Sequence, residues 1–290
     1  MICNLCPRRC NAQRTKTENL KGFCKMPLLP SVARADLHFW EEPIISGENG
    51  SGTIFFSGCS LSCAFCQNYE LSHNGFGKQI SCERLAEIFK ELEQKGAHNI
   101  NLVTPTHFIY AIKKALEIYK PKIPIVYNSS GYELTESLRK LEGLVDIYLL
   151  DLKYISNDKA KLYSKAENYP EFAKKAVLEA VRQQPTACFK EGIMQKGVIV
   201  RHLLLPQGTK EAIAVFDWVK ENAKEAYFSL MSQYIPCGEA VTMPIINRKI
   251  TSREYEKVVD YVINQNFPNV FIQERKSADK KYIPEFSQSI

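Results

Sequence analysis

The chain has 290 residues, of which 45% are hydrophobic and 24% are charged. This is the composition of an ordinary globular protein, and it excludes a collagen-like repeat, a coiled coil and wholesale disorder. The first residues contain no apolar stretch typical of a signal peptide, and no run of about 18 apolar residues occurs anywhere. We therefore expect a cytoplasmic location and no membrane partner.

The first 36 residues, here called the leader, concentrate both charge and cysteine. The chain has a net charge of +6, and residues 1–25 hold six basic residues against one acidic residue. Clustered cysteines in a reducing compartment indicate metal ligands rather than disulfides. Four of them lie in the leader: Cys3, Cys6, Cys10 and Cys24. Because four thiolates suit zinc and an iron–sulfur cluster equally, the leader is predicted to be a small Cys-rich extension with a possible second metal site.

Residues 37–290 are predicted to form the main domain, which begins with a possible strand at 37–47. After it, short apolar runs alternate with amphipathic stretches, as in repeated βα units around a parallel sheet. Strands are expected at 53–57, 99–104, 123–128, 147–152, 198–205 and 226–232. Helices are expected at 82–95, 108–119, 134–141, 158–183, 211–223 and 252–264. Since the strands read as buried on both faces and six units cannot close an eightfold barrel, we predict an α/β fold, a partial (β/α)6 TIM-like barrel.

Several helix boundaries carry local signals. Ser81 precedes one predicted helix, and Thr251 with Glu254 three residues later forms a capping-box pattern before another. Tyr169-Pro170 is predicted to interrupt the longest helical stretch, because a residue before proline is biased away from helical backbone angles. Functional residues are expected at the carboxyl ends of the strands, where the βα loops gather.

Three further cysteines follow the first predicted barrel strand in a segment that we call the cysteine loop (residues 58–68). Cys59, Cys63 and Cys66 are spaced so that their sulfurs can converge on one iron–sulfur cluster and leave one iron open to another ligand. Two alternatives stay open. A redox pair would use Cys63 and Cys66 alone, and a structural zinc would need His73 as its fourth ligand.

The Cys-x-x-x-Cys-x-x-Cys motif after the first strand of a βα array resembles that of the radical S-adenosylmethionine superfamily. Over residues 50–238 the chain is similar to the pyruvate formate-lyase-activating enzyme and its relatives. The resemblance implies a 4Fe–4S cluster on Cys59, Cys63 and Cys66 whose open iron binds S-adenosylmethionine. Reductive cleavage of that cofactor would give a 5'-deoxyadenosyl radical that takes hydrogen from a substrate, while the protein supplies position and shelter.

The same resemblance implies a set of cofactor contacts at the strand ends. The residues are Asn128, Ser129, Ser130, Asp151, Lys153 and Arg201. Asp151 and Lys153 share one face of their strand and are similar to the Asp-x-Lys pair of the activating enzymes, although an ion pair at a strand end is the alternative. The turn at 128–131 is either a cofactor-lining turn or a plain one. Arg201 interrupts an apolar strand, so its charge needs a partner such as a cofactor carboxylate.

The chain departs from the activating enzymes in its second barrel strand, where their Gly-Gly-Glu is replaced by Leu-Val-Thr-Pro-Thr-His at 102–107. Backbone carbonyls and Thr104 or Thr106 would then take over the role of the glutamate. Together with the Cys-rich leader, this replacement resembles a divergent, activating-enzyme-like subgroup. Near the last predicted strand, Cys237 is either a thiol facing the substrate or an ordinary buried cysteine.

Three functions remain open at this point. The first is hydrogen abstraction from a glycyl residue of a protein partner, and the second is radical modification of another peptide or small molecule. The third is a non-enzymatic metal-binding module whose basic leader grips nucleic acid, although nucleic acid is an unlikely partner because no aromatic platform is evident. For either enzyme, an acidic electron donor such as flavodoxin or ferredoxin is expected to dock on the basic leader.

Overall fold

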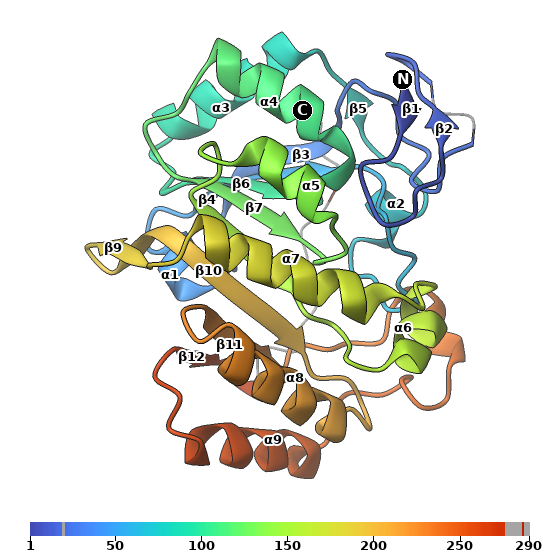
Figure 1. Ribbon diagram of the computed structural model, residues 1–290, viewed down its shortest axis with the longest axis vertical. Coiled ribbons are helices and arrows are strands. Elements are labelled where there is room, and N and C mark those ends of the chain that lie inside the picture. Colours follow the sequence, from blue (N-terminus) through green and yellow to red (C-terminus); the bar gives the residue numbers. More distant parts are fainter. Residues whose placement is uncertain (19–20, 276–285, 287–290) are drawn as a thin grey trace.

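A mostly parallel sheet organises the protein, of which the computed structural model describes residues 1–18, 21–275 and 286 (Figure 1). Within these residues, seven neighbouring strands are parallel: β4 (Ser51–Phe56), β6 (Ile100–Val103), β7 (Ile125–Ser129), β8 (Ile147–Asp151), β10 (Ile193–Leu203), β11 (Tyr227–Met231) and β12 (Val270–Ile272). The order across the sheet is β12-β11-β10-β8-β7-β6-β4-β3-β5, in which β3 (Ser31–His38) and β5 (Lys78–Gln79) are antiparallel to their neighbours. A short strand, β9 (Cys188–Lys190), pairs with the start of β10.

Helices connect the parallel strands and cover the outer face of the sheet (Figure 1). They are α3 (Cys82–Gln94), α4 (Ile109–Ile118), α5 (Thr135–Leu138), α6 (Asn157–Ser164), α7 (Tyr169–Gln183), α8 (Thr209–Asn222) and α9 (Ser252–Asn264). Their apolar faces and the outward side chains of the strands form the main core, in which Phe89, Ile112 and Phe216 are fully buried. This outer packing fixes the strands, so that the loops at their carboxyl ends have a rigid base.

A second, smaller core fills the inner face of the sheet at the amino ends of the strands. Val126, Ile147, Leu149 and Ile199 point inward there, because side chains alternate between the two faces of a strand. They pack around Ile45 of the short helix α1 (Pro43–Ser46). The helix α1 therefore closes the amino end of the barrel interior and leaves the carboxyl ends of the strands for a site.

The structure confirms the predicted α/β fold and the partial barrel, and each of the six predicted strands coincides with an observed one. The cap signals are also confirmed: the Ser81 side chain accepts a hydrogen bond from the backbone of α3, and Thr251 and Glu254 form a complete capping box at α9. The stretch 158–183 divides into α6 and α7. Pro170 lies in the first turn of α7, where its missing N–H leaves no helical hydrogen bond unmade.

The strand expected at 37–47 is wrong. The strand β3 covers Ser31–His38 instead, and residues 43–46 form α1. Pro43 stands at the start of that helix, where its fixed φ angle suits the first turn. Residue 36, at which the leader was expected to end, therefore lies inside β3. The strand β12 was not predicted, since its three residues are too few to show a period.

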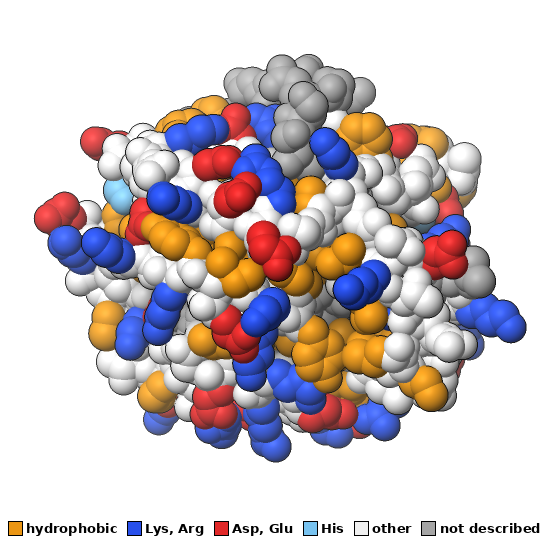
Figure 2. Space-filling view, turned by 90° about the horizontal axis from the view of Figure 1, so that it is seen from above, with side chains coloured by type: hydrophobic (Ala, Val, Ile, Leu, Met, Phe, Trp, Pro, Cys, Tyr) orange, Lys and Arg blue, Asp and Glu red, His pale blue; other side chains and the backbone are white. Residues whose placement is uncertain are grey.

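The leader forms a small hairpin of two short strands, β1 (Ile2–Cys3) and β2 (Ala12–Gln13), beside the short helix α2 (Tyr69–Ser72) (Figure 1). None of the helices in the described part of the chain is long and apolar enough to span a membrane. Figure 2 shows the face seen from above, where the visible Lys and Arg side chains are mixed with Asp and Glu. That face therefore does not present the uniform basic surface that a phosphate backbone prefers.

Candidate functional site

A pocket of about 850 Å³ opens at the carboxyl ends of the strands. Every predicted cofactor contact and all three cysteines of the cysteine loop line it: Cys59, Cys63, Cys66, Asn128, Ser129, Ser130, Asp151, Lys153 and Arg201. These residues come from the loops or ends of β4, β7, β8 and β10. The parallel sheet thus brings together residues that are as far as 142 positions apart in the chain, Cys59 and Arg201.

The cysteine loop is fixed by hydrogen bonds to its backbone and to its sulfurs. The backbone N–H of Ala64 donates to the carbonyl of Tyr163 over 2.8 Å. The Ser164 hydroxyl lies 3.0 Å from the Cys63 sulfur, and the Ser72 hydroxyl donates to the Cys66 sulfur over 3.2 Å. Because hydrogen bonds to ligand sulfurs help to set the reduction potential of an iron–sulfur cluster, these serines are placed to tune such a centre.

The three thiols of the cysteine loop are protonated at neutral pH in the metal-free protein. Burial raises the pKa of Cys66 to about 11, and burial is also the largest cause of the raised pKa values of Cys59 and Cys63. Since iron and zinc bind thiolates, binding a metal here would release protons. Both ring nitrogens of His73 are already hydrogen-bonded to serine hydroxyls, at 3.1 and 2.7 Å, so His73 is a poor fourth ligand for zinc.

A cluster asks less of the spacing of the thiols than a single ion does. Over the part of the chain that the structure describes, no three Cys, His, Asp or Glu side chains lie close enough to share one metal ion. In a 4Fe–4S cluster each thiolate binds a different iron, so the sulfurs need not meet at one point. Three half-buried or buried thiols facing a large pocket meet that requirement and leave space for a ligand on the open iron.

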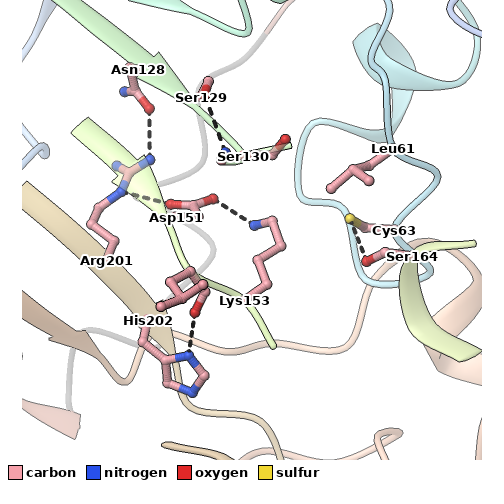
Figure 3. A network of polar contacts seen from close by, with 12 residues as sticks. Leu61, Cys63, Asn128, Ser129, Ser130, Asp151, Lys153, Ser164, Arg201 and His202 are labelled. Atoms are coloured by element: carbon pink, nitrogen blue, oxygen red, sulfur yellow. Dashed lines mark hydrogen bonds and ion pairs between the residues drawn. The ribbon is translucent and has the colours of Figure 1, made fainter. Parts of the chain in front are cut away.

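A charged network forms the wall of the pocket opposite the cysteine loop (Figure 3). Arg201 donates to Asp151 over 2.9 Å and to the side-chain oxygen of Asn128 over 2.7 Å. Lys153 contacts the other oxygen of Asp151 over 2.6 Å. Burial alone would raise the pKa of Asp151, but Lys153 and Arg201 outweigh it and hold that pKa below its ordinary value. Asp151 is therefore a fixed carboxylate between two cations.

Two carboxylates that the sequence did not single out complete this network. Glu41 pairs with Arg201 over 3.1 Å and accepts hydrogen bonds from Asn101 and Asn128. Glu42 lies 3.9 Å from Arg201, and burial raises its pKa although Arg201 opposes that shift. Both precede α1, which carries them to the floor of the pocket. In the sequence these two residues are visible only as an acidic pair before Pro43. Because a strand was expected at 37–47, the pair was not considered as part of a site.

Tyr169 and Gly131 fix the segments after β7 and β8, which carry Ser130 and Lys153. The buried Tyr169 hydroxyl donates to the carbonyls of Ser130 and Asp151, and it accepts from the backbone N–H of Lys153 over 2.9 Å. Gly131 has a φ of 76°, and a Cβ atom there would overlap the Asp151 carbonyl oxygen. Only glycine allows the turn after β7 to lie this close to the end of β8.

Three further residues, Thr106, Cys237 and His202, are not among the described residues that line the pocket. Thr106 donates to the buried Glu133 over 2.6 Å, so of the two threonines only Thr104 lines the pocket. The Cys237 thiol donates to the Phe65 carbonyl and is not among the described residues that line the pocket. His202 is buried, and its Nδ1 lies 2.8 Å from the carbonyl oxygen of Leu152, as expected for a packing histidine (Figure 3).

The leader cysteines form a separate group outside the large pocket. Cys3 is buried, Cys6 and Cys24 are half-buried, and Cys10 is exposed. The fully buried Arg14 donates to the Cys3 sulfur over 3.5 Å. Cys24 interacts electrostatically with Arg14, Cys3 and Cys10, and Cys6 with Cys3 and Cys24, so the four thiols are neighbours, and none of them lines the large pocket.

Two solved structures resemble the chain in fold. SuiB from Streptococcus suis, bound to S-adenosylmethionine, has a TM-score of 0.54 and 15% identity, and the match covers 75% of this chain and 48% of SuiB. Methylornithine synthase (PylB) has a TM-score of 0.53 and 16% identity, with 83% of this chain and 65% of that structure covered. The chain therefore spans less than two thirds of either structure.

Two sequence comparisons identify the family. The chain is 31% identical over 279 residues to an uncharacterized protein of Methanocaldococcus jannaschii, and the match covers 93% of this chain and 76% of that protein. A family model described as the radical SAM superfamily matches residues 53–219, more than half of the chain, and this range includes the cysteine loop, most of β4 and the whole of β6, β7, β8 and β10. The chain therefore belongs to the radical SAM superfamily, whose enzymes use a 4Fe–4S cluster and S-adenosylmethionine.

Proposed function

We propose that the chain cleaves S-adenosylmethionine reductively at a 4Fe–4S cluster held by Cys59, Cys63 and Cys66. The cluster and cofactor would supply one electron and a carbon-centred radical to the pocket. The observation that carries the proposal is that Cys59, Cys63 and Cys66, on one loop of a radical SAM barrel, all line the pocket. Three thiolates leave one iron of the cluster for the cofactor.

The polar residues across the pocket are proposed to bind and orient S-adenosylmethionine. Asp151, held ionised by its two cations, can accept hydrogen bonds from ribose hydroxyls. Lys153 lies between Asp151 and the cysteine loop, where it can meet a carboxylate (Figure 3). Asn128, Ser129 and Ser130 line the same wall, where the Ser129 hydroxyl accepts a hydrogen bond from the Gly131 N–H. Their common face supports one extended ligand along the strand ends.

We further propose that the substrate is a glycyl residue of a protein partner, as the similarity to activating enzymes implies. The outer rim of the pocket supports a bulky substrate, because Phe39 and Trp40 after β3 and Phe271 of β12 line it at the two edges of the open barrel. Phe39 and Trp40 are exposed, so a peptide can reach them. Another peptide or a small molecule is the alternative substrate.

The leader is proposed to carry the second metal and to receive the electron donor. The buried Arg14 contacts Cys3 and its charge acts on Cys24, which neighbours the other leader thiols, and this grouping supports a metal-thiolate centre. Lys16, Lys21 and Lys25 are exposed there and offer positive charge to an acidic donor of the flavodoxin or ferredoxin class.

The test is anaerobic reconstitution with iron and sulfide, followed by reduction with dithionite and measurement of 5'-deoxyadenosine. We expect release from the wild type and from Cys82→Ala, whose thiol lies on the outer helix α3. Cys63→Ala should release none. Wild-type protein that binds about four irons at the cysteine loop yet releases no 5'-deoxyadenosine would refute the proposed function.

The glycyl substrate is tested separately by co-expressing the enzyme with a candidate partner protein. Electron paramagnetic resonance of the partner should show a glycyl radical that depends on Cys63. Turnover of a free peptide or metabolite without any signal on a partner would favour the alternative substrate instead.

A further inference from the structure

The leader lies directly against the cysteine loop. Gly58, which precedes Cys59, has a φ of 77°, and a Cβ atom there would lie 2.8 Å from the Cys24 carbonyl oxygen and overlap Met26. This contact limits the separation of the Cys24 and Cys59 Cα atoms to about 11 Å. Both cysteines also line a second cavity of about 390 Å³ between the leader and α2. The two cysteine groups are therefore neighbours in space.

Arg8 ties the two groups together. It lies between Cys6 and Cys10 in the leader, and its guanidinium donates to the Ser60 carbonyl of the cysteine loop over 2.8 Å. It also donates to the carbonyl of Lys165 over 2.6 Å. The ring of Phe23, next to Cys24, stacks 3.8 Å from the guanidinium carbon. One side chain thus fixes the leader cysteines relative to the loop that carries Cys59 and Cys63.

Arg14 indicates that the leader centre is anionic. Its side chain is 1% exposed, and its Nε has no hydrogen-bond partner. Its other nitrogens donate to the Cys3 sulfur and to the Pro27 carbonyl, and no described carboxylate pairs with it. A buried guanidinium without an anion is strongly unfavourable. Thiolates bound to a metal centre at the leader would supply the missing negative charge.

A cluster asks less of the spacing of the leader thiols than a single zinc ion does. Within residues 1–18, 21–275 and 286, no three candidate ligands share one ion position, and this holds for the leader as it does for the cysteine loop. A tetrahedral zinc site requires all four sulfurs at about 2.3 Å from one point. Four thiolates that each bind a different iron of a 4Fe–4S cluster do not.

We infer that Cys3, Cys6, Cys10 and Cys24 hold a 4Fe–4S cluster that relays electrons to the cluster of the cysteine loop. The inference rests on the proposed function, because the electron that the leader cluster relays is used by the cluster on Cys59, Cys63 and Cys66. A reduced flavodoxin or ferredoxin gives one electron to the leader centre and is itself oxidised. The leader centre passes that electron to the loop centre. From there it reaches the sulfonium of S-adenosylmethionine, whose carbon–sulfur bond breaks to give methionine and the deoxyadenosyl radical.

The first measurement is the iron, sulfide and zinc content of anaerobically reconstituted protein. Two complete 4Fe–4S sites predict about eight irons per chain in the wild type. The leader variant Cys6→Ser/Cys24→Ser and the loop variant Cys59→Ala/Cys63→Ala/Cys66→Ala should each keep about four. The matched control Cys82→Ser/Cys188→Ser, which changes two cysteines outside both groups, should keep about eight. The loop variant keeps the inference testable even if the leader variant does not fold.

The second measurement follows reduction of the loop cluster by electron paramagnetic resonance, with either dithionite or reduced flavodoxin. We expect the leader variant to be reduced by flavodoxin at least about tenfold more slowly than the control. Dithionite, a small reductant that needs no docking site, should reduce both at similar rates. Arg8→Gln should slow the flavodoxin reaction while iron content stays at the wild-type value, because it loosens the contact between the two groups.

Four irons in the wild type, one zinc in place of the leader cluster, or no iron in the loop variant would each overturn the inference. If flavodoxin reduced the loop cluster at equal rates in the leader variant and the control, the leader would not relay electrons, and the inference would be wrong as well. Failure of the proposed function looks different. In that case the wild type holds about eight irons and is reduced normally, but releases no 5'-deoxyadenosine with either reductant.

Discussion

Replacing Arg201 by methionine should destabilise the protein severely, because this one cation holds a buried acidic cluster together. Its side chain is 14% exposed, and it pairs with Asp151 at 2.9 Å and Glu41 at 3.1 Å, whose side chains are 12% and 10% exposed. Glu42, 7% exposed, lies at 3.9 Å. Arg201→Met keeps much of the aliphatic volume and removes only the charge and its donors.

The expected loss follows from the burial of the partners. Removing one member of a buried ion pair leaves an uncompensated charge and lowers the free energy of unfolding by about 3–5 kcal/mol. An exposed pair gives a matched control. Arg84 contacts Glu91 on the surface of α3, with side chains 37% and 50% exposed, so Arg84→Met should lose about 1 kcal/mol or less.

The loss should grow with pH. In the variant, the pKa of Glu42, which burial already raises, rises further above that of the unfolded chain, because Arg201 no longer opposes the effect of burial. A carboxyl whose pKa is raised by folding stabilises below its unfolded pKa, near 4, and loses that contribution as pH rises through its folded pKa. Arg201→Met should therefore be closest to the wild type near pH 5 and furthest from it near pH 8.

Urea unfolding of the metal-free protein at pH 5 and pH 8, followed by circular dichroism, measures both effects. The double variant Arg201→Met/Glu42→Gln should recover part of the loss at pH 8, since the buried carboxyl beside position 201 can then no longer ionise. A loss below about 1 kcal/mol at pH 8, or a loss that does not change with pH, would show that Arg201 does not hold these carboxylates in the folded state.

Three further substitutions test the packing and polarity of the site. Gly131→Ala should lose clearly more stability in urea than Gly143→Ala, which should lose about 1–2 kcal/mol, because both have a positive φ but only Gly131 lies against a carbonyl; equal losses would contradict that close approach. Burial raises the pKa of Glu133 to about 7, so its neutral form stabilises the protein below pH 4.5, and about 3 kcal/mol of unfolding free energy is lost by pH 8. Glu133→Gln should flatten this dependence of stability on pH. An unchanged dependence in the variant would show that Glu133 is not its source. Ser164→Ala removes the hydroxyl that lies 3.0 Å from the Cys63 sulfur, so the free energy of unfolding should fall by about 1 kcal/mol. The reduction potential of the reconstituted centre should become more negative in a redox titration. An unchanged potential would argue against this hydrogen bond.

The barrel could be predicted from the sequence because its signals are local and periodic. Buried strands such as β8 are continuous apolar runs, and the capping box of α9 consists of residues three positions apart. The strand predicted at 37–47 was wrong because residues 43–46 form the four-residue helix α1. Its apolar residues pack inside the barrel instead of extending the sheet, and a short apolar run does not distinguish these outcomes.

The cysteine loop and the Asp151–Lys153 pair could also be predicted, since each lies at the end of a predicted strand. Glu41 could not, because its partners Asn101, Asn128 and Arg201 follow it by 60 to 160 positions. No spacing along the chain announces a contact of that range. Tyr169 was missed for the same reason: it lies in α7, but its hydroxyl acts on the ends of β7 and β8.

The network also separates the roles of the two cations. Arg201 is committed to Asp151 and Glu41 within the protein, so a ligand carboxylate would have to displace existing ion pairs to reach it. Lys153 has three donors and is hydrogen-bonded to Asp151 alone among the described side chains, and its charge already acts on Cys63. We therefore expect Lys153 to meet the carboxylate of S-adenosylmethionine, while Arg201 positions Asp151. In equilibrium dialysis, Lys153→Met should weaken cofactor binding about tenfold or more, as expected for a lost hydrogen bond to a charged group. A larger loss of affinity from Arg201→Lys than from Lys153→Met would reverse the two roles.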